Sequence, residues 1–118
     1  MLLSALILIG ACVRRGADQE GAELTAGDPA RGRVAIVRYG CGACHAIPGV
    51  SNAKGLVGPP LSGIANRAYI GGVLGNTPDN MIEWLRNPQA VSPKTAMPNL
   101  HVSERDARDI ASYLYTLK

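Results

Sequence analysis

The sequence contains no phenylalanine and only one tryptophan, Trp84, among its 118 residues. Large aromatic side chains fill much of the core in most small domains, and a domain of this length buries only about two-thirds of its unfolded surface. Something other than aromatic residues therefore has to supply apolar volume. The 14 glycines and 8 prolines are concentrated in the middle of the chain, which predicts long ordered loops wrapped around another object.

Blocks of one charge are also missing. The 12 basic and 9 acidic residues give a formal net charge of +3, and they are spread along the sequence without interleaved aromatic residues. Nucleic-acid binding depends on a concentrated basic surface, so this distribution excludes nucleic acid as the partner. The function has to be found in individual motifs.

The N-terminal apolar run, MLLSALILIGAC, is too short to cross a hydrocarbon layer of about 30 Å as a helix. It is typical of a signal peptide, and LIGAC resembles the processing site of bacterial lipoproteins, where small residues precede a cysteine that is lipidated. This predicts residues 1–11 as a signal peptide and Cys12 as a membrane anchor, which explains the odd total of 3 cysteines. A buried cysteine in an apolar helix is an alternative, as is a start codon placed too late, because the run lacks the usual basic residues.

Residues 12–27 are polar, rich in glycine and without hydrophobic periodicity. This composition predicts a flexible, lipid-anchored tether with a root-mean-square reach of about 20 Å. Such a tether would let a small domain swing between two nearby membrane proteins.

The folded domain, residues 28–118, is predicted to be all-α. N-capping side chains, prolines at first helical positions and apolar residues at i, i+3, i+4 and i+7 indicate three main helices. Residues 46–76, between the first and second helices, show no strand alternation and only one short helix, over residues 63–70. The main helices are expected to begin at Asp28–Pro29, Thr77–Pro78 and Ser103, with the second ending before Pro88 and the third running to the chain end.

Two cysteines three positions apart, Cys41 and Cys44, are followed directly by His45. On one helical turn both sulfurs can form thioethers to the two vinyl groups of a porphyrin, and His45 projects from the same side toward the iron. A thioredoxin-like dithiol needs a βαβ unit, and a disulfide leaves the histidine without a role. A closed zinc site needs four ligands, and only His101 and Cys12 remain to complete one. The motif therefore predicts one covalently bound haem c, which also supplies the missing apolar volume.

The second axial ligand has to come from another segment. Met97 stands in SPKTAMPNL, between prolines and without helical periodicity, as expected of a loop that carries a thioether to the iron. Met81 lies on the apolar face of the second helix and is interpreted as core, whereas His101 is the alternative ligand. A histidine and a methionine on the iron leave no open position and favour electron transfer. A gas sensor or a haem enzyme would require Met97 not to bind.

From Asp28 to Lys118 the sequence resembles a class I cytochrome c. The resemblance rests on CGACH, GPPL, an arginine eight residues after the first proline of that motif, WLRNP, AMP and DIASYL. It is particularly similar to the cytochrome domain fused to subunit II of some bacterial haem-copper oxidases. The resemblance implies three main helices plus loops wrapped around one covalent haem, with Gly32 where the first and last helices cross. It also implies an electron carrier that is not itself an enzyme.

The resemblance further implies roles for individual residues. The Pro59 carbonyl accepts a hydrogen bond from His45 Nδ1, which fixes the imidazole ring and makes its other nitrogen more basic. Arg67 corresponds to an arginine that pairs with a buried haem propionate, Asn76 to a propionate donor, and Trp84 to an aromatic ring beside the methionine sulfur. A solvated arginine, a turn asparagine and a core tryptophan remain the alternatives.

Together these features predict a membrane-tethered monohaem cytochrome on the outer, periplasmic face of the bacterial cytoplasmic membrane. It would carry electrons between a quinol-oxidising complex and a terminal haem-copper oxidase. A permanently bound subunit of a respiratory complex, or the acceptor of a periplasmic dehydrogenase, is the alternative. The segments expected to border the haem edge, 46–62 and 89–100, carry only Lys54 and Lys94 as charges. This predicts a mainly apolar docking surface and weak salt dependence.

Overall fold

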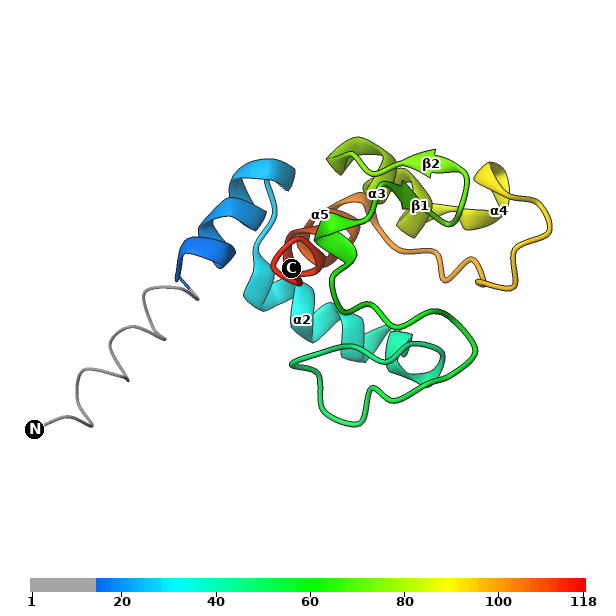
Figure 1. Ribbon diagram of the computed structural model, residues 1–118, viewed down its shortest axis with the longest axis horizontal. Coiled ribbons are helices and arrows are strands. Elements are labelled where there is room, and N and C mark those ends of the chain that lie inside the picture. The colour runs from blue at the N-terminus through cyan, green and yellow to red at the C-terminus, as the bar shows by residue number, and fades with distance from the viewer. Residues whose placement is uncertain (1–14) are drawn as a thin grey trace, which may run out of the picture.

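The computed structural model describes residues 15–118 of the chain. Residues 15–25 are helical, and the loops of residues 46–62 and 92–102 connect the elements that follow (Figure 1). The elements after residue 25 are α2 (Pro29–Arg38), η1 (Cys41–Ala43), η2 (Ile64–Asn66), β1 (Tyr69–Ile70), β2 (Leu74–Gly75), α3 (Pro78–Arg86), α4 (Pro88–Val91) and α5 (Glu104–Leu114).

Helices α2 and α5 cross at the centre of the molecule and make the most extensive contact among the elements that follow residue 25. The carboxylate of Asp28 caps α2 by accepting from the Arg31 backbone N–H at 2.9 Å. At the crossing, a Cβ atom on Gly32 would overlap the Asp109 carbonyl group, whose carbon lies 2.5 Å from that position. Only glycine allows this approach. The predicted start of the first helix is confirmed, and Gly32 lies at the crossing as the resemblance implied.

The hydrophobic core lies between α2, α3 and α5. Side chains at helical spacing on each of the three helices are buried there, as their apolar periodicity predicts. Met81 is 2% exposed, which places it in the core as expected. The core residues on these helices are Ala35, Ile36, Met81, Ile82, Trp84, Leu85, Ala107, Ile110, Ala111 and Leu114.

The second helix ends as predicted, but a further helix follows it. Thr77 Oγ1 caps α3 by accepting from the Asn80 backbone N–H at 3.2 Å, and Pro88 ends it. Asn87 Oδ1 accepts from the Ala90 backbone N–H at 3.3 Å, so Pro88 is also the first residue of α4. The proline serves both as a stop and as a start.

The segment between the first and second helices differs from the prediction. The short helix expected over residues 63–70 is only the single 3₁₀ turn η2. The chain then forms a two-residue antiparallel ladder in which Tyr69 faces Gly75 and Ile70 faces Leu74. Helix α5 also ends earlier than expected, at Leu114, because the remaining residues turn back toward η2.

The segment before α2 does not match the flexible tether expected over residues 12–27. Residues 15–25 are helical, with Gly21 and Thr25 buried. Hydrophobic periodicity could not reveal this helix, because small residues form the buried face. Within residues 15–118, no helix combines the length and apolarity needed to cross a membrane. The predicted signal peptide, residues 1–11, and Cys12 lie outside the described residues.

Candidate functional site

One tight turn presents the two thiols and the imidazole of the CGACH motif together. Gly40, in the left-handed region at φ 72°, ends α2 and starts the 3₁₀ turn η1. The Cys41 carbonyl accepts from the backbone N–H groups of Cys44 and His45, at 3.2 and 3.0 Å. Neither Cys41 nor Cys44 is in a disulfide, and both are half-buried. The thiols are therefore free and lie within one turn of each other.

The imidazole of His45 is oriented by a backbone carbonyl. His45 Nδ1 lies 2.7 Å from the Pro59 carbonyl oxygen. Because a carbonyl oxygen can only accept, Nδ1 carries the proton and donates, and the lone pair is on Nε2. This is the tautomer that a metal-binding imidazole needs, and the bond makes Nε2 more basic.

Glycines let the following loop lie directly against this turn. The Gly55 N–H donates to the Gly42 carbonyl at 3.1 Å, and the Gly58 N–H donates to the Cys44 carbonyl at 2.8 Å. A Cβ atom on Gly58 would overlap the His45 ring carbon Cε1 and lie 2.7 Å from Nδ1. The loop backbone therefore encloses one edge of the imidazole, a contact that the sequence analysis did not identify.

Met97 lies on the loop of residues 92–102, as predicted, and packs half-buried against the core. Its backbone N–H donates to Thr95 Oγ1 at 3.2 Å. Its carbonyl oxygen accepts from Gln89 Nε2 on α4 at 2.6 Å. Gln89 was missed by the sequence analysis, and the Asn87–Pro88 pair, which repeats the N-cap and proline pattern of the earlier helices, could have revealed the helix that carries it.

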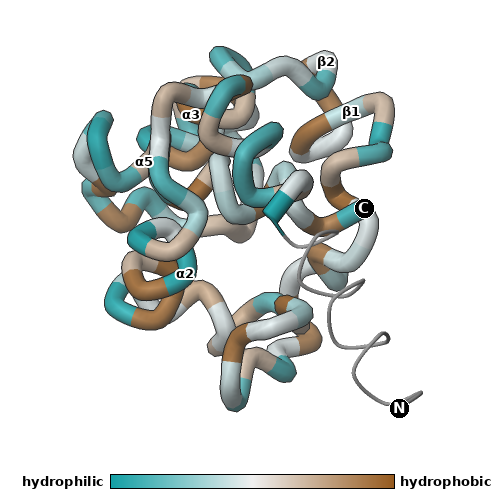
Figure 2. The backbone as a smooth tube through the Cα atoms, turned by 90° about the vertical axis from the view of Figure 1, so that its left-hand side faces the viewer, coloured by the Kyte–Doolittle hydropathy of each residue, from teal (hydrophilic) through white to brown (hydrophobic). Residues whose placement is uncertain are grey.

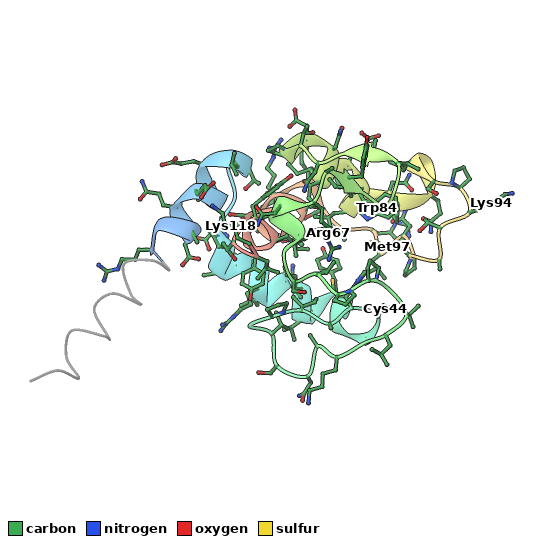
Figure 3. The ribbon with its side chains drawn as sticks, viewed as in Figure 1. Cys44, Arg67, Trp84, Lys94, Met97 and Lys118 are labelled. Atoms are coloured by element: carbon green, nitrogen blue, oxygen red, sulfur yellow. The ribbon has the colours of Figure 1, made fainter. Side chains whose placement is uncertain are left out.

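The labelled side chains of Cys44, Arg67, Trp84 and Met97 lie in the same half of the molecule, with Lys118 in the other half (Figure 3). Trp84 is buried on α3, next to the Gly71 backbone, where a Cβ atom would lie 2.5 Å from the ring. Arg67 is half-buried, and its Nη2 group donates to the carbonyl oxygens of Pro60 and Ser62. These hydrogen bonds from Arg67 stabilise the loop that carries Pro59.

Asn76 differs from its predicted role as a propionate donor. Its Nδ2 group donates to the carbonyl oxygens of Ile64 and Arg67, at 2.9 and 2.8 Å. Its Oδ1 atom accepts from the Tyr115 hydroxyl at 2.8 Å. Both amide hydrogens are therefore used within the protein. Asn76 therefore joins η2 to the C-terminal end of α5. Its amide group donates to backbone carbonyls in and after η2, and its oxygen accepts from Tyr115 at the end of α5.

Burial sets the protonation of two groups around the site. Burial raises the pKa of the Cys41 thiol, and the neighbouring Cys44 adds to the increase. The Cys41 sulfur is therefore protonated at neutral pH. Burial also raises the pKa of Tyr115 to about 12, so its hydroxyl remains a neutral donor to Asn76.

This donor set fits a covalently bound haem. The two free thiols can form thioethers, the imidazole has its metal-binding nitrogen available, and a thioether side chain stands on a separate loop. The surroundings also fit, because half-buried apolar residues, which suit a macrocycle, pack against the core. These residues include Val50, Leu61, Ala65, Leu74 and Val91.

Comparison with known proteins agrees with the site. A family model described as cytochrome c matches residues 29–118. The chain belongs to the cytochrome c family. This cytochrome therefore carries covalently bound haem c, for which Cys41 and Cys44 are present, and it is an electron carrier that is not itself an enzyme.

Two curated relatives are both described as cytochrome c oxidase subunit 2. The protein of Alkalihalophilus pseudofirmus is 33% identical over 89 residues, which cover 75% of this cytochrome and 25% of the relative. The protein of Bacillus sp. strain PS3 is 31% identical over 88 residues, which cover 71% and 25%. The chain thus spans about a quarter of the length of these relatives. No solved structure matches it significantly.

Proposed function

We propose that this chain is a membrane-tethered monohaem cytochrome that carries single electrons between a quinol-oxidising complex and a terminal haem-copper oxidase. The observation that carries the proposal is the CGACH turn, with its imidazole oriented by the Pro59 carbonyl at 2.7 Å. The similarity to two cytochrome c oxidase subunits supports a respiratory context. The outer face of the cytoplasmic membrane is the location that this context favours.

In this proposal His45 Nε2 and the Met97 sulfur would both bind the haem iron. When bound, the haem supplies a reversible one-electron change at its iron. The Pro59 carbonyl keeps the imidazole in one tautomer, and Trp84 would pack beside the Met97 sulfur, as the resemblance implies. With His45 and Met97 both bound, the iron would have no position left for a substrate.

Two polar side chains keep the loops in place. Arg67 holds the Pro60 and Ser62 carbonyls through Nη2, so its other donors are available to a propionate. Asn76 joins η2 to the C-terminal end of α5 through its bonds to Ile64, Arg67 and Tyr115.

The surface beside the haem-binding turn is apolar. Leu56 is 92% exposed and Val57 is 74% exposed, and both stand between the glycines that bond to the CGACH turn. Apolar residues alternate with polar ones in this projecting loop at the lower end of the molecule (Figure 2). We therefore propose that the partner docks through apolar contact next to His45, with Lys54 at the edge of the surface.

Ligand binding by Met97 is tested with Met97→Ala and, as a matched control, His101→Ala in the holoprotein. Native ferrous protein and His101→Ala should not take up carbon monoxide, whereas Met97→Ala should bind it. Ready uptake by the native protein would mean an open iron position and favour a sensor or an enzyme. Uptake by His101→Ala alone would assign the ligand to His101.

Membrane attachment and partnership need separate measurements. Mass spectrometry of the mature protein should show residues 1–11 removed and an acylated Cys12. A free thiol with residues 1–11 retained would contradict the anchor. After mild detergent extraction, loss of the cytochrome from the oxidase on washing identifies a mobile carrier. A stoichiometric band identifies the alternative, a permanently bound subunit.

A further inference from the structure

Helix 15–25 packs on α5 along a face of small residues. Gly21 and Thr25 are buried, and Ala17, one turn earlier on the same face, is half-buried. A Cβ atom on Gly21 would overlap the Ser112 carbonyl oxygen and lie 3.2 Å from the Ser112 carbonyl carbon. Because these are backbone atoms of a helix, they cannot move aside easily. The helix reaches α5 this closely only because residue 21 is glycine.

Polar contacts join the same two helices at other points. Arg108 Nη1 on α5 donates to the Thr25 carbonyl at 3.3 Å. The Lys118 ammonium group, beyond the end of α5, forms an ion pair with Glu20. Gly27 passes the Arg108 carbonyl so closely that a Cβ atom there would overlap it. These contacts with α5 hold the described residues of the helix, 15–25, against the domain.

The helix lies at the opposite end of the molecule from the haem-binding side chains. Figure 1 places the helix at one end, and Figure 3 places Cys44 and Met97 on the far side of α5 from it. Cys12 precedes Arg15 by three peptide units, which span at most about 10 Å. A lipid on Cys12 would keep the Arg15 end of the helix within that distance of the headgroups.

We propose that helix 15–25 is a fixed spacer that holds the cytochrome domain in one orientation on the membrane. The side that carries Cys44 and Met97 then faces away from the anchored end. This inference rests on the lipidation of Cys12 proposed above. A partner in the same membrane must then present its docking surface above the headgroups, toward the side of the domain that lies away from the anchored end.

The contact with α5 is tested by Gly21→Ala, with Gly16→Ala as the matched control. Both substitutions add one methyl group to the same helix and favour helix formation. A Cβ atom at position 16 has nothing within 4 Å, whereas one at position 21 overlaps α5. In amide hydrogen exchange on the lipidated holoprotein, wild type and Gly16→Ala should protect residues 18–25, and Gly21→Ala should lose that protection. Equal protection in all three proteins overturns the contact.

The orientation is tested by linear dichroism of the haem absorption in aligned bilayers. Wild type and Gly16→Ala should give a dichroic haem band, and Gly21→Ala should give an isotropic one. An isotropic band from membrane-bound wild type overturns the spacer and leaves the electron carrier intact. If wild type is absent from the membrane fraction, both the lipid anchor and the spacer are overturned. The two measurements therefore distinguish failure of the anchor from failure of the spacer alone.

A charge variant covers the case in which Gly21→Ala yields no holoprotein. Glu20→Lys opposes Lys118 with a like charge, and adding Lys118→Glu restores an opposite pair. Exchange over residues 18–25 should be about threefold faster in Glu20→Lys and should recover in the double variant. Identical exchange in wild type, single and double variants overturns the role of this pair in holding the spacer.

Discussion

At the scale of the residue, the imidazole of His45 is held by backbone atoms. The Pro59 carbonyl accepts its proton, and the Gly58 backbone lies against its ring edge. Hydrogen bonds that orient a metal ligand also raise its basicity and the affinity of the site for the metal. The orientation of the His45 ring therefore depends on the position of the loop that carries Gly58 and Pro59.

Gly58→Ala should displace the imidazole, because a Cβ atom there would overlap ring carbon Cε1. We expect a lower yield of holoprotein and a shifted reduction potential. Visible spectroscopy and potentiometry measure both. Gly75→Ala is the control, because a Cβ atom at position 75 has nothing within 4 Å. Unchanged spectra and potential in Gly58→Ala would show that the ring is not confined by this loop.

Asp109 should contribute stability that is lost in acid. Burial raises the pKa of its carboxyl, but hydrogen bonds from Arg31 and from the Asp28 backbone N–H outweigh burial and leave the pKa below its ordinary value. The contribution is present above the ordinary pKa of about 3.9. It disappears as the pH falls through the lower pKa of the folded state.

Asp109→Asn should therefore lower the free energy of unfolding by about 2 kcal/mol at neutral pH. The difference from wild type should shrink as the pH falls below about 4. Denaturant unfolding across pH measures it. Asp18→Asn is the control, because it removes an equal charge from an exposed position. A difference that stays constant with pH would contradict the role given to the carboxylate.

The role of a residue could be predicted from the sequence where the residue belongs to a recognisable motif. The pairing of His45 with Pro59 followed from the resemblance and is confirmed by the distance of 2.7 Å. Asn76 was predicted as a propionate donor, but its bonds go to Ile64, Arg67 and Tyr115. The partners of a turn asparagine depend on how distant segments meet, and a linear sequence does not contain that information.

At the scale of the element, three helices begin with the same local pattern. Asp28–Pro29, Thr77–Pro78 and Asn87–Pro88 each place a capping side chain before a proline. The first two starts were predicted from this pattern. The third was interpreted only as a stop, because a helix had just ended there. Helix 15–25 was not predicted. It packs on α5 through the close approach of Gly21 to the Ser112 backbone, so its sequence shows no apolar stripe.

Gly32→Ala should separate α2 from α5, because its Cβ atom would overlap the Asp109 carbonyl group. The expected loss is about 3 kcal/mol of unfolding free energy. Thermal or denaturant unfolding of the holoprotein measures it. Gly16→Ala, in a helix but without a neighbour within 4 Å, should be neutral or slightly stabilising. Equal stability of the two variants would show that the crossing can relax at little cost.

At the scale of the whole molecule, the haem has to act as part of the core. Trp84 is the single tryptophan in a chain without phenylalanine, and several apolar residues that pack against the core are only half-buried. Small domains that depend on a bound group often fold only with it. The sequence could predict this dependence because composition alone shows the deficit of large apolar side chains.

The double variant Cys41→Ala, Cys44→Ala, purified without haem, should be largely unfolded. Its far-ultraviolet circular dichroism should lose most of the helical signal of the holoprotein. Wild-type holoprotein purified in parallel is the reference. A native-like helical spectrum from the double variant would show that the chain folds without the cofactor.

Electron transfer to a membrane oxidase should depend weakly on salt, because Leu56 and Val57 are neutral and exposed beside the site. We expect less than about a twofold change in rate between low and physiological ionic strength. Leu56→Glu should slow transfer and make it salt-dependent, since it places a charge in the docking surface. Val73→Glu is the control, because Val73 is also exposed but lies in the turn between β1 and β2. A steep salt dependence in wild type would contradict apolar docking.

The crossing of α2 with α5 joins the first turn of the cytochrome domain to its last. A ribosome releases residue 29 well before residue 114, so α2 lacks its main partner until translation is almost complete. The nascent polypeptide therefore cannot form its main helix pair during synthesis. An exported chain, as proposed above, would therefore form this pair only after it has crossed the membrane.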